Sequence, residues 1–289
     1  GLYLRIMDIL FHENETEIRG CPDFDLDKTF TCGQCFRWRR EDGEDGAVSY
    51  AGVAYGKAAR VRQAGESVFI SGGREDFEAL WRHYFDLDRD YAAVRAHLSQ
   101  DPYMARAAAC GAGIRILRQE PWEALCSFIV SQCNNIPRIT RIVETLCGLY
   151  GEPITFEGRV LYAFPGPEKL ASLSEEDLAP LRCGYRARYI LGAARAVAEG
   201  RLDLQALKEA PEEEAVETLK TLEGVGEKVA RCAALYGLGK LDAFPVDTWM
   251  RKVLSGPYGG RLDPGRFSPY AGIAQQYLFH YIRNCACSA

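Results

Sequence analysis

A lysine and an aspartate flank a glycine-rich turn in the C-terminal half of the chain, and together they could carry out chemistry. Residues 222–247 read LEGVGEKVARCAALYGLGKLDAFPVD. A helix-forming run follows the turn Gly224-Val225-Gly226, with Lys228 in its first turn and Asp247 about twenty residues later. Glycine allows a sharp turn and a close approach of another backbone, and the free N–H groups at a helix start suit a phosphate. An amine and a carboxylate beside such a turn predict covalent chemistry on a nucleic-acid sugar.

Taken singly, these features have ordinary structural explanations. A Gly-X-Gly turn occurs at many helix starts, and a lysine in a first helical turn is usually a solvated charge that opposes the helix dipole. The chemical interpretation therefore depends on whether other parts of the chain supply groups that recognise a nucleic acid.

Three further motifs offer such groups. The polar break SQCNNIPR (residues 131–138) is either an interhelical turn capped by asparagine or a set of contacts to base edges, with Arg138 as a forked donor. The segment GYRARY (residues 184–189) is either an exposed helix start or an aromatic wedge that enters a base stack. Gln275 and Phe279 lie four residues apart and therefore share one face of a helix. Phe279 alone would indicate a side chain in the hydrophobic core. The pair could instead form one wall of a base pocket.

The motif Cys32-Gly33-Gln34-Cys35 has three interpretations. It could be a redox pair, half of a zinc site completed by Cys285 and Cys287, or a buried turn before a strand, which the missing βαβ context favours. The chain has eleven cysteines, an odd number, and no signal-peptide pattern. We therefore expect a reducing compartment in which most cysteines are small buried hydrophobes.

Bulk composition indicates a globular protein and weakly disfavours a nucleic-acid partner. The chain has 289 residues, 47% of them hydrophobic, and a formal net charge of −5. Phosphate contacts need a local positive face rather than a positive total, and arginines do cluster at residues 37–40 and 182–188. Because no apolar run approaches membrane-spanning length, we expect a soluble intracellular protein, in the cytoplasm or nucleoid of a bacterium or the nucleus of a eukaryote.

The elements that must position these groups predict an α+β protein with two domains. Residues 1–100 are expected to form an antiparallel sheet over 1–72 followed by short helices at 76–84 and 91–98. Residues 101–289 are expected to be mostly helical, with the helix-hairpin-helix at about 212–238. Individual strands are predicted at 48–53, 58–62 and 67–71, helices at 122–132, 137–150, 185–199 and 270–282, and a hairpin or crossing strands within 151–166.

The motifs together resemble the 8-oxoguanine DNA glycosylase/AP lyase family, in the helix-hairpin-helix (HhH-GPD) superfamily of DNA glycosylases. The resemblance runs from about Phe24 to Arg283 and is carried by CGQCFRW, SFIVSQCNNIPRIT, CGYRARY, LEGVGEKVARC, FPVDTWM and PYAGIAQQYLF. It implies a TATA-binding-protein-like antiparallel sheet packed on a helical domain, with the active site in the cleft. It also implies a bifunctional enzyme that excises 8-oxoguanine opposite cytosine and then nicks the strand.

The resemblance assigns roles to the residues that match these motifs. Lys228 would attack C1′ of the damaged nucleoside, and Asp247 would stabilise positive charge on the sugar. The carbonyl of Gly33 would accept the N7 proton that 8-oxoguanine has and guanine lacks. Phe279 and Cys232 would sandwich the base, and Gln275 would read its Watson–Crick edge. The remaining DNA contacts would be Asn134, Arg138 and Arg186 at the opposite cytosine, Tyr185 as the wedge, and Gly224 and Gly226 at a hairpin phosphate.

The resemblance further implies duplex DNA containing oxidised guanine as the partner of a monomeric enzyme. No cofactor and no metal ligand set are expected, although backbone carbonyls of the hairpin could hold a monovalent cation. Two positions depart from the family pattern: Cys133 replaces the first of three asparagines, and Trp249 replaces a histidine that contacts a phosphate. The rival interpretations are a monofunctional glycosylase for alkylated bases, a non-catalytic helix-hairpin-helix DNA-binding protein, and a thiol oxidoreductase.

Overall fold

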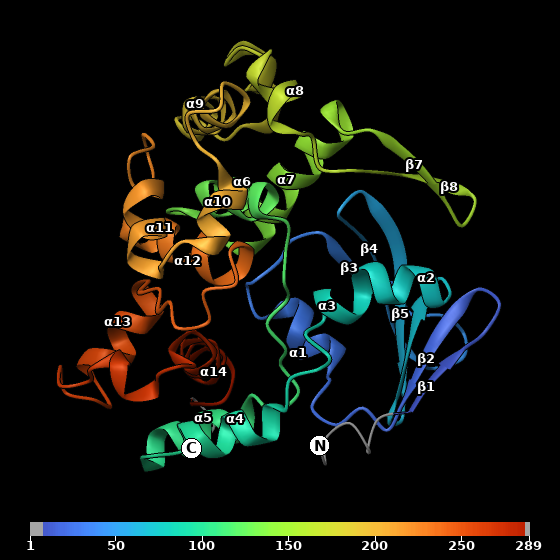
Figure 1. Cartoon of the computed structure of the whole chain (residues 1–289), viewed down its shortest axis with the longest axis vertical. Helices are drawn as coiled ribbons and strands as arrows, with labels where there is room; N and C mark the ends of the chain where they lie inside the picture. Colours follow the sequence, from blue (N-terminus) through green and yellow to red (C-terminus); the bar gives the residue numbers. More distant parts are fainter. Residues whose placement is uncertain (1–7, 287–289) are drawn as a thin grey trace.

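The computed structural model describes residues 8–286, which form an antiparallel sheet and a larger group of helices (Figure 1). The sheet has six strands in the order β1-β2-β6-β5-β4-β3, and paired neighbours are antiparallel. The predicted α+β class is confirmed. The strands are β1 (Asp8–Phe11), β2 (Glu15–Arg19), β3 (Trp38–Arg40), β4 (Val48–Ala54), β5 (Lys57–Ala64) and β6 (Ser67–Ser71).

The longest strand pairing joins β4 to β5 through a turn at Tyr55 and Gly56. Both residues have positive φ, 53° and 70°, which gives a two-residue hairpin the twist of its strands. Along β5 and β6, Val61 and Ile70 are fully buried, whereas their neighbours on each strand are only partly buried. This period of two is what the sequence predicted for the meander.

A short helix, α1 (Leu26–Thr31), lies within the region predicted as β structure. The side chain of Asp25 accepts a hydrogen bond from the backbone N–H of Lys28 at 2.9 Å and caps the first turn. Leu26 and Phe30 bury their side chains in the core beside the sheet. The prediction of β structure over residues 1–72 is wrong here, because six residues are too few to display a helical period.

Most of the helices lie beside the sheet and pack around a hydrophobic core of their own (Figure 1). The predicted helix at 76–84 is present as three consecutive turns, and it buries Phe77, Trp81 and Tyr84 against the sheet core. The helical elements are α2 (Arg74–Asp76), η2 (Phe77–Trp81), α3 (Arg82–Tyr84), α4 (Tyr91–Leu98), α5 (Pro102–Cys110), α6 (Pro121–Ser131), α7 (Ile136–Tyr150), α8 (Pro167–Ala171), η3 (Glu176–Leu181), α9 (Arg186–Ala198), α10 (Leu204–Glu209), α11 (Glu212–Leu219), α12 (Glu227–Gly237), α13 (Thr248–Ser255), η4 (Pro264–Phe267) and α14 (Ala271–Asn284).

Two hydrophobic cores divide the molecule. One lies between the sheet, α1 and the turns at 74–84, and the other lies among the helices. Helices α4 and α5 belong to the second core, where they lie beside α14 at the bottom of Figure 1, far from α4 in sequence. The loop after α1 contributes Cys32 and Phe36 to the same core. This loop therefore reaches from the sheet region into the helical region.

A two-stranded hairpin, β7 (Pro153–Phe156) and β8 (Arg159–Tyr162), extends from the helical part to β4 and β5, two inner strands of the sheet (Figure 1). It confirms the hairpin predicted within 151–166. Ion pairs fasten the seam between the two parts. The pairs are Arg39–Glu144, Arg60–Glu157 and Arg159–Glu41.

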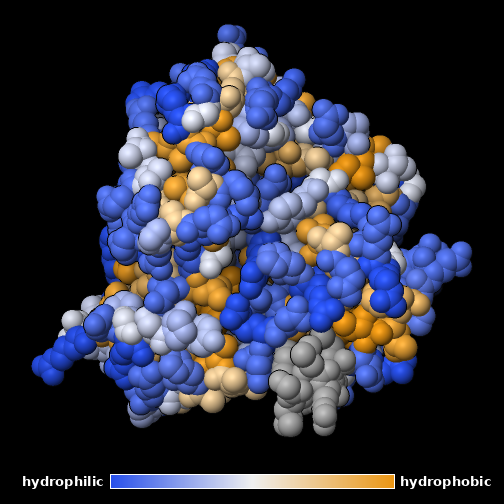
Figure 2. Space-filling view, viewed as in Figure 1, coloured by the Kyte–Doolittle hydropathy of each residue, from blue (hydrophilic) through white to orange (hydrophobic). Residues whose placement is uncertain are grey.

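The surface seen in Figure 2 is largely hydrophilic, and its hydrophobic residues form small groups rather than one broad patch. Within residues 8–286, no helix is long and apolar enough to cross a membrane.

Candidate active site

Residues from four distant segments line one small cavity of about 50 Å³. The cavity contains all six residues predicted to catalyse the reaction or to hold the damaged base. Its lining residues are Cys32, Gly33, Phe128, Lys228, Cys232, Tyr236, Pro245, Asp247, Gln275 and Phe279. Two larger cavities, of about 330 and 760 Å³, continue from it, and Lys228 and Asp247 line all three. The amine and the carboxylate therefore lie where a buried pocket meets an open cleft.

Lys228 lies in the first turn of α12, and its Nζ lies 3.2 Å from Oγ of Ser131. The Ser131 hydroxyl itself donates to the carbonyl of Phe128 at 2.7 Å, so its oxygen acts as an acceptor for the lysine. Within residues 8–286, no carboxylate forms an ion pair with Lys228. The amine is therefore held by a neutral group and remains available to a ligand in the cavity.

Asp247 is the N-cap of α13, where it accepts a hydrogen bond from the backbone N–H of Met250 at 2.8 Å. The positive end of the helix stabilises a carboxylate at this position. Its other oxygen, Oδ2, accepts no hydrogen bond from the residues that the structure describes. One oxygen therefore orients the side chain, and the second is available to a substrate.

The loop at Gly33 presents a free backbone carbonyl. Gln276 Nε2 donates to the carbonyl of Cys32 at 3.0 Å, and Gln119 Nε2 donates to the carbonyl of Gln34 at 2.6 Å. Gly33 lies between them with a φ of 86°, which glycine adopts without strain. In the described part of the chain, its carbonyl accepts no hydrogen bond. Hydrogen bonds therefore hold the loop on both sides of Gly33, while the carbonyl of Gly33 remains available to a ligand.

The opposite walls of the cavity combine one amide with apolar groups. Gln275 is only 5% exposed, and its Oε1 has no hydrogen-bond partner among residues 8–286. A buried acceptor without a partner costs free energy, which a hydrogen-bonding ligand would recover. The Phe279 ring is half-buried, and its Cε1 would lie 3.3 Å from a Cβ built at Gly33. Burial raises the pKa of Cys232 to about 11, which keeps that wall uncharged at neutral pH.

The polar break between α6 and α7 lines the outer cleft. Asn135 caps α7 by accepting the backbone N–H of Arg138 at 3.0 Å, so the interpretation as an Asn-capped turn is correct. Asn134 donates to the carbonyl of Val130 and accepts from the N–H of Asn135, both at 3.0 Å. Cys133 is exposed with a φ of 48°, a conformation that asparagine adopts more readily than cysteine.

The two arginines predicted to contact the opposite base differ in how many of their guanidinium donors already bind the protein. Arg138 is half-buried, and its guanidinium donates one hydrogen bond, to the carbonyl of Arg182 at 3.2 Å. Arg186 is only 4% exposed, and its guanidinium donates to three backbone carbonyls. These carbonyls belong to Gln132, Cys133 and Cys183. The structure thus uses Arg186 to hold the loop that carries Asn134.

Tyr185 is the predicted wedge, and it is 50% exposed at the start of α9. Its ring makes an edge contact with Tyr189, with 5.6 Å between the centroids. Tyr189 in turn covers Gly224, where a Cβ would lie 2.2 Å from the ring. The wedge and the hairpin are therefore joined through one aromatic side chain.

The predicted helix-hairpin-helix consists of α11, the turn at 224–226, and α12. Gly224 has a φ of 82°, and Gly226 is the N-cap of α12. The carbonyl of Gly224 accepts a hydrogen bond from Nε2 of Gln132 at 3.1 Å. A cation bound by the hairpin backbone would have to share this carbonyl or use its neighbours, and such a site remains a prediction.

The CxxC motif is a buried turn. Cys32 and Cys35 are unpaired and belong to different hydrophobic cores. Burial raises the pKa of Cys32 to about 12 and that of Cys35 as well, so neither supplies a thiolate at neutral pH. The redox interpretation is therefore wrong. Cys285 is bonded to Cys110 and does not complete a zinc site with Cys32 and Cys35, so that half of the zinc interpretation is wrong; Cys287 lies outside the described residues.

Sequence reasoning missed the side chains that position the site. Ser131 was grouped with a polar loop, although it holds the amine of Lys228. Gln119 and Gln276, which fix the Gly33 loop, were not singled out. The doublet Gln275-Gln276 in a helix is the one signal that points to them, because burying two adjacent amides requires partners for both.

Comparisons with known proteins agree with this geometry. Residues 19–125 match the family described as "8-oxoguanine DNA glycosylase, N-terminal domain", and residues 126–262 match the "HhH-GPD superfamily base excision DNA repair protein" family. An N-glycosylase/DNA lyase of Arabidopsis thaliana is 32% identical over 281 residues, which cover 88% of this chain and 76% of that protein. A probable N-glycosylase/DNA lyase of Methanothermobacter thermautotrophicus is 30% identical, with 73% of this chain and 75% of that protein covered.

A solved structure is similar over nearly the whole chain. The 8-oxoguanine glycosylase/lyase of Clostridium acetobutylicum, in complex with double-stranded DNA containing cytosine opposite 8-oxoguanine, superimposes with a TM-score of 0.90. It is 38% identical, and the match covers 96% of this chain and 98% of that one. The chain therefore belongs to the 8-oxoguanine DNA glycosylase family of the HhH-GPD superfamily, and it is a DNA glycosylase with lyase activity.

Proposed function

We propose that this enzyme excises 8-oxoguanine, preferentially opposite cytosine, from duplex DNA and then cleaves the strand through a Schiff base on Lys228. The observation that carries the proposal is the shared cavity, in which Lys228 and Asp247 face a free carbonyl and an unpartnered amide. A glycosylase that only activated water would not need an amine there. We expect a monomer that uses no cofactor.

The pocket offers the hydrogen-bonding groups that oxidised guanine requires. The Gly33 carbonyl is an acceptor for N7–H, which guanine lacks, and Gln275 is available to the Watson–Crick edge. Phe279 and Cys232 would stack on the two faces of the base. A cavity of about 50 Å³ holds a few water molecules and not a purine, so the Phe279 ring must move when the base enters.

The base must leave the helical stack first, at a cost of roughly a few kcal/mol. The exposure of Tyr185 supports its assignment as the side chain that fills the gap, and the guanidinium donors that Arg138 does not use among the described residues support its assignment to the orphaned cytosine. We assign Arg186 and Asn134 to the same region, with Arg186 also fixing the loop. Gly224 and Gly226 would place the hairpin N–H groups at a phosphate.

The chemistry follows from the amine and the carboxylate. The lone pair of Lys228 attacks C1′, and the electron pair of the glycosidic bond leaves with the base, which takes up a proton. Asp247 stabilises the positive charge that develops on the sugar. Opening of the sugar ring gives an iminium between Lys228 and C1′, which withdraws electrons from C2′. Loss of a C2′ proton then expels the 3′ phosphate by β-elimination.

Borohydride trapping on a duplex with 8-oxoguanine tests this assignment. Lys228→Gln should abolish the covalent complex, because an amide is not a nucleophile, while DNA binding stays within a few-fold of the wild type. Lys252→Gln is the matched control, since it removes a positive charge near Trp249 (Nζ is 4.7 Å from the ring centroid) without lining the cavity. An undiminished adduct in Lys228→Gln would refute the role of this lysine.

The rival functions predict other results in the same assay. A monofunctional enzyme for alkylated bases would release 3-methyladenine and give no trapped complex, and a non-catalytic DNA-binding protein would give no product under single-turnover conditions. Repeating the excision with cytosine, adenine, guanine or thymine opposite the lesion measures the opposite-base preference. Equal rates on all four duplexes would contradict the proposed preference for cytosine.

A further inference from the structure

Two sulfur atoms and an imidazole meet at the C-terminal end of α14, outside the catalytic cavity. Cys110 is the last residue of α5, and His280 and Cys285 come from the last turns of α14 and its C-cap. Their ligand atoms all lie within 4.8 Å of one another, and all three residues are half-buried. We propose that, in the reduced protein, these three side chains bind a Zn²⁺ ion that joins α5 to α14.

The donor set suits zinc. Zinc binds thiolate sulfur at about 2.3 Å and imidazole nitrogen at about 2.0 Å, with four ligands in a tetrahedral arrangement. Two cysteines and one histidine supply three of these positions, and softer sulfur ligands favour zinc over magnesium or calcium. The fourth position is open to water or to another side chain. Cys287 follows Cys285 by two residues in the sequence but lies outside the described part of the chain.

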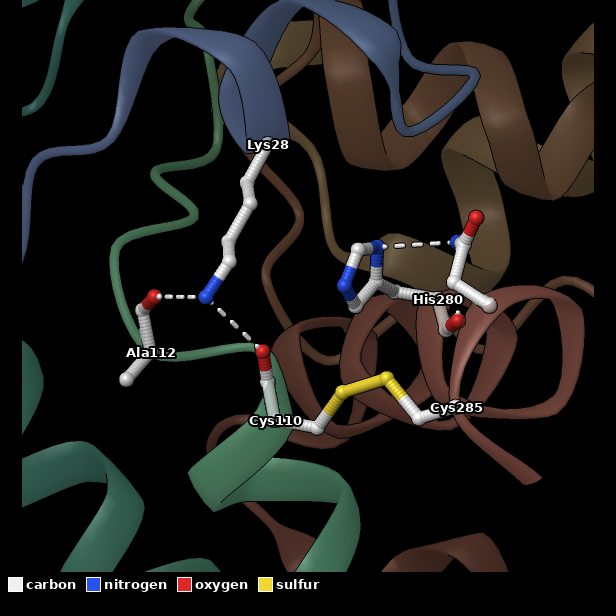
Figure 3. The surroundings of a disulfide bond; sticks show 6 residues. Lys28, Cys110, Ala112, His280 and Cys285 are labelled. Carbon is white, nitrogen blue, oxygen red and sulfur yellow. Dashed lines mark hydrogen bonds between the residues drawn. A yellow bond between two sulfur atoms is a disulfide. The ribbon is translucent and has the colours of Figure 1, made fainter. Parts of the chain in front are cut away.

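The backbone spacing favours a shared metal over a direct bond as the resting state of the pair. The structure joins the two sulfurs (Figure 3), but the Cα atoms of Cys110 and Cys285 are 7.1 Å apart. Disulfides usually span about 4.4–6.8 Å between Cα atoms. An ion placed between the sulfurs lengthens the link and fits the wider spacing. A disulfide would also give no reason for the imidazole beside it.

The surroundings supply neighbours of the kind that metal ligands use. Figure 3 shows the imidazole of His280 beside the two sulfurs, with Nδ1 at 3.2 Å from the amide nitrogen of Asn284. The same Asn284 nitrogen donates to the backbone carbonyl of His280 at 3.0 Å, so Asn284 holds the last turn of α14 and the position of the imidazole ring. Lys28 donates to the carbonyls of Cys110 and Ala112, both at 3.1 Å, and so fixes the end of α5 beside the two sulfurs (Figure 3).

The state of the other cysteines agrees with a reducing environment. All eight remaining cysteines in the described part of the chain are unpaired. Reduction of the Cys110–Cys285 bond by a dithiol or a phosphine takes up two electrons and two protons. Zinc then displaces both thiol protons and forms one bond with each thiolate electron pair. The ion would tie the helix that carries Gln275 and Phe279 to α5, and it touches neither side chain.

Cobalt titration of the reduced, metal-free protein tests the site. One equivalent of Co²⁺ should give the thiolate charge-transfer band and the intense visible bands of tetrahedral coordination, and Zn²⁺ should remove both. Cys110→Ser and Cys285→Ser should each weaken binding at least a hundredfold, and His280→Ala at least tenfold. Cys133→Ser, which deletes the exposed thiol elsewhere, should bind cobalt as the wild type does.

Two measurements on the unmodified chain keep the test decisive if a variant fails to fold. Zinc should protect Cys110 and Cys285 from alkylation, and a hundredfold excess over the dissociation constant should raise the unfolding midpoint by roughly 5–10 °C. Absence of the charge-transfer band, or equal binding by Cys110→Ser and Cys133→Ser, would overturn the site. Since the borohydride assay does not involve these residues, that result would leave the proposed function untouched.

Discussion

Ser131 gives Lys228 a single neutral contact, which under the proposed function leaves the amine available to a substrate. A carboxylate partner would stabilise Lys228 as an ammonium ion, which has no lone pair to offer. Ser131 accepts only one N–H and adds no negative charge, because its own proton goes to the carbonyl of Phe128. The carboxylate of Asp247 lines the same cavity but is oriented by its cap on α13. Among the described residues, Lys228 and Asp247 thus line one cavity without forming an ion pair with each other.

Gly33→Ala should weaken the preference for 8-oxoguanine over guanine by tenfold or more. Alanine is strained at a φ of 86°, and its Cβ would lie 3.3 Å from the Phe279 ring, so the loop must shift and carry the free carbonyl with it. Single-turnover excision from matched duplexes with each base measures the ratio.

Gly56→Ala is the control for that substitution. Gly56 has a φ of 70°, but a Cβ there meets no atom within 4 Å, and the turn lies on the sheet hairpin. It carries a similar backbone strain without a change at the pocket, so its base preference should equal that of the wild type. Unchanged discrimination in Gly33→Ala would show that this carbonyl does not read the base.

The residues that we predict to act on DNA stand out in the sequence, whereas those that hold them in place do not. Lys228, Asp247 and the Gly33 loop lie in short motifs whose order and spacing are visible in the chain. Gln119 and Gln276 make their contacts with residues 85 and 244 positions away, so no local period reveals them. An amide that supports a loop looks, in sequence, like any other polar residue of a helix.

At the scale of elements, the hairpin is built by packing as much as by backbone freedom. Gly224 lies under the Tyr189 ring, and Gln132 binds its carbonyl, so the turn contacts both α9 and the loop after α6. These contacts place the glycine turn, Tyr185 and Lys228 in a fixed relation. The sequence predicted the two helices and their turn correctly, but it could not show that an aromatic ring from another helix closes over the first glycine.

Gly224→Ala and Gly226→Ala separate packing from backbone effects. A Cβ at Gly224 would lie 2.2 Å from the Tyr189 ring, in addition to the strain of a φ of 82°, so we expect a loss of roughly 2–4 kcal/mol in unfolding free energy and weaker DNA binding. Gly226 has no atom within 4 Å of such a Cβ and a φ of −95°, so Gly226→Ala should cost less than about 1 kcal/mol.

Urea unfolding of both variants, with DNA affinity measured alongside, checks this pair. Equal losses in the two variants would mean that Tyr189 does not hold the turn. A large loss in Gly226→Ala alone would instead point to the N–H groups of the helix start as the sensitive feature.

At the scale of the whole molecule, the catalytic cavity depends on how the sheet region and the helical region are joined. The Gly33 loop leaves the sheet region and supplies one wall, while α6, α12, α14 and the loop that ends at the N-cap of α13 supply the others. Composition and periodicity predicted the two regions, but they placed no contact between them. The ion pairs of the β7–β8 hairpin and a buried pair formed by Arg37 and Glu123 make this joint.

Glu123 should make the stability of this joint depend on pH. Burial raises the pKa of Glu123 to about 7 from a usual value near 4.5, against the opposing charge of Arg37 3.6 Å away. Between these two values the folded state holds a proton that the unfolded state has released. The contribution of Glu123 to the free energy of unfolding is therefore complete below about pH 4.5 and is lost as the pH rises to 7, by roughly 3 kcal/mol in total.

Glu123→Gln is uncharged at every pH and of similar shape, so it should remove this loss. The unfolding free energy of the variant relative to the wild type, measured by urea denaturation from pH 4.5 to 8, should rise by roughly that amount. Parallel curves for the two proteins would show that Glu123 is ionised in the folded state throughout, and that the Arg37 pair joins the two regions as a buried ion pair.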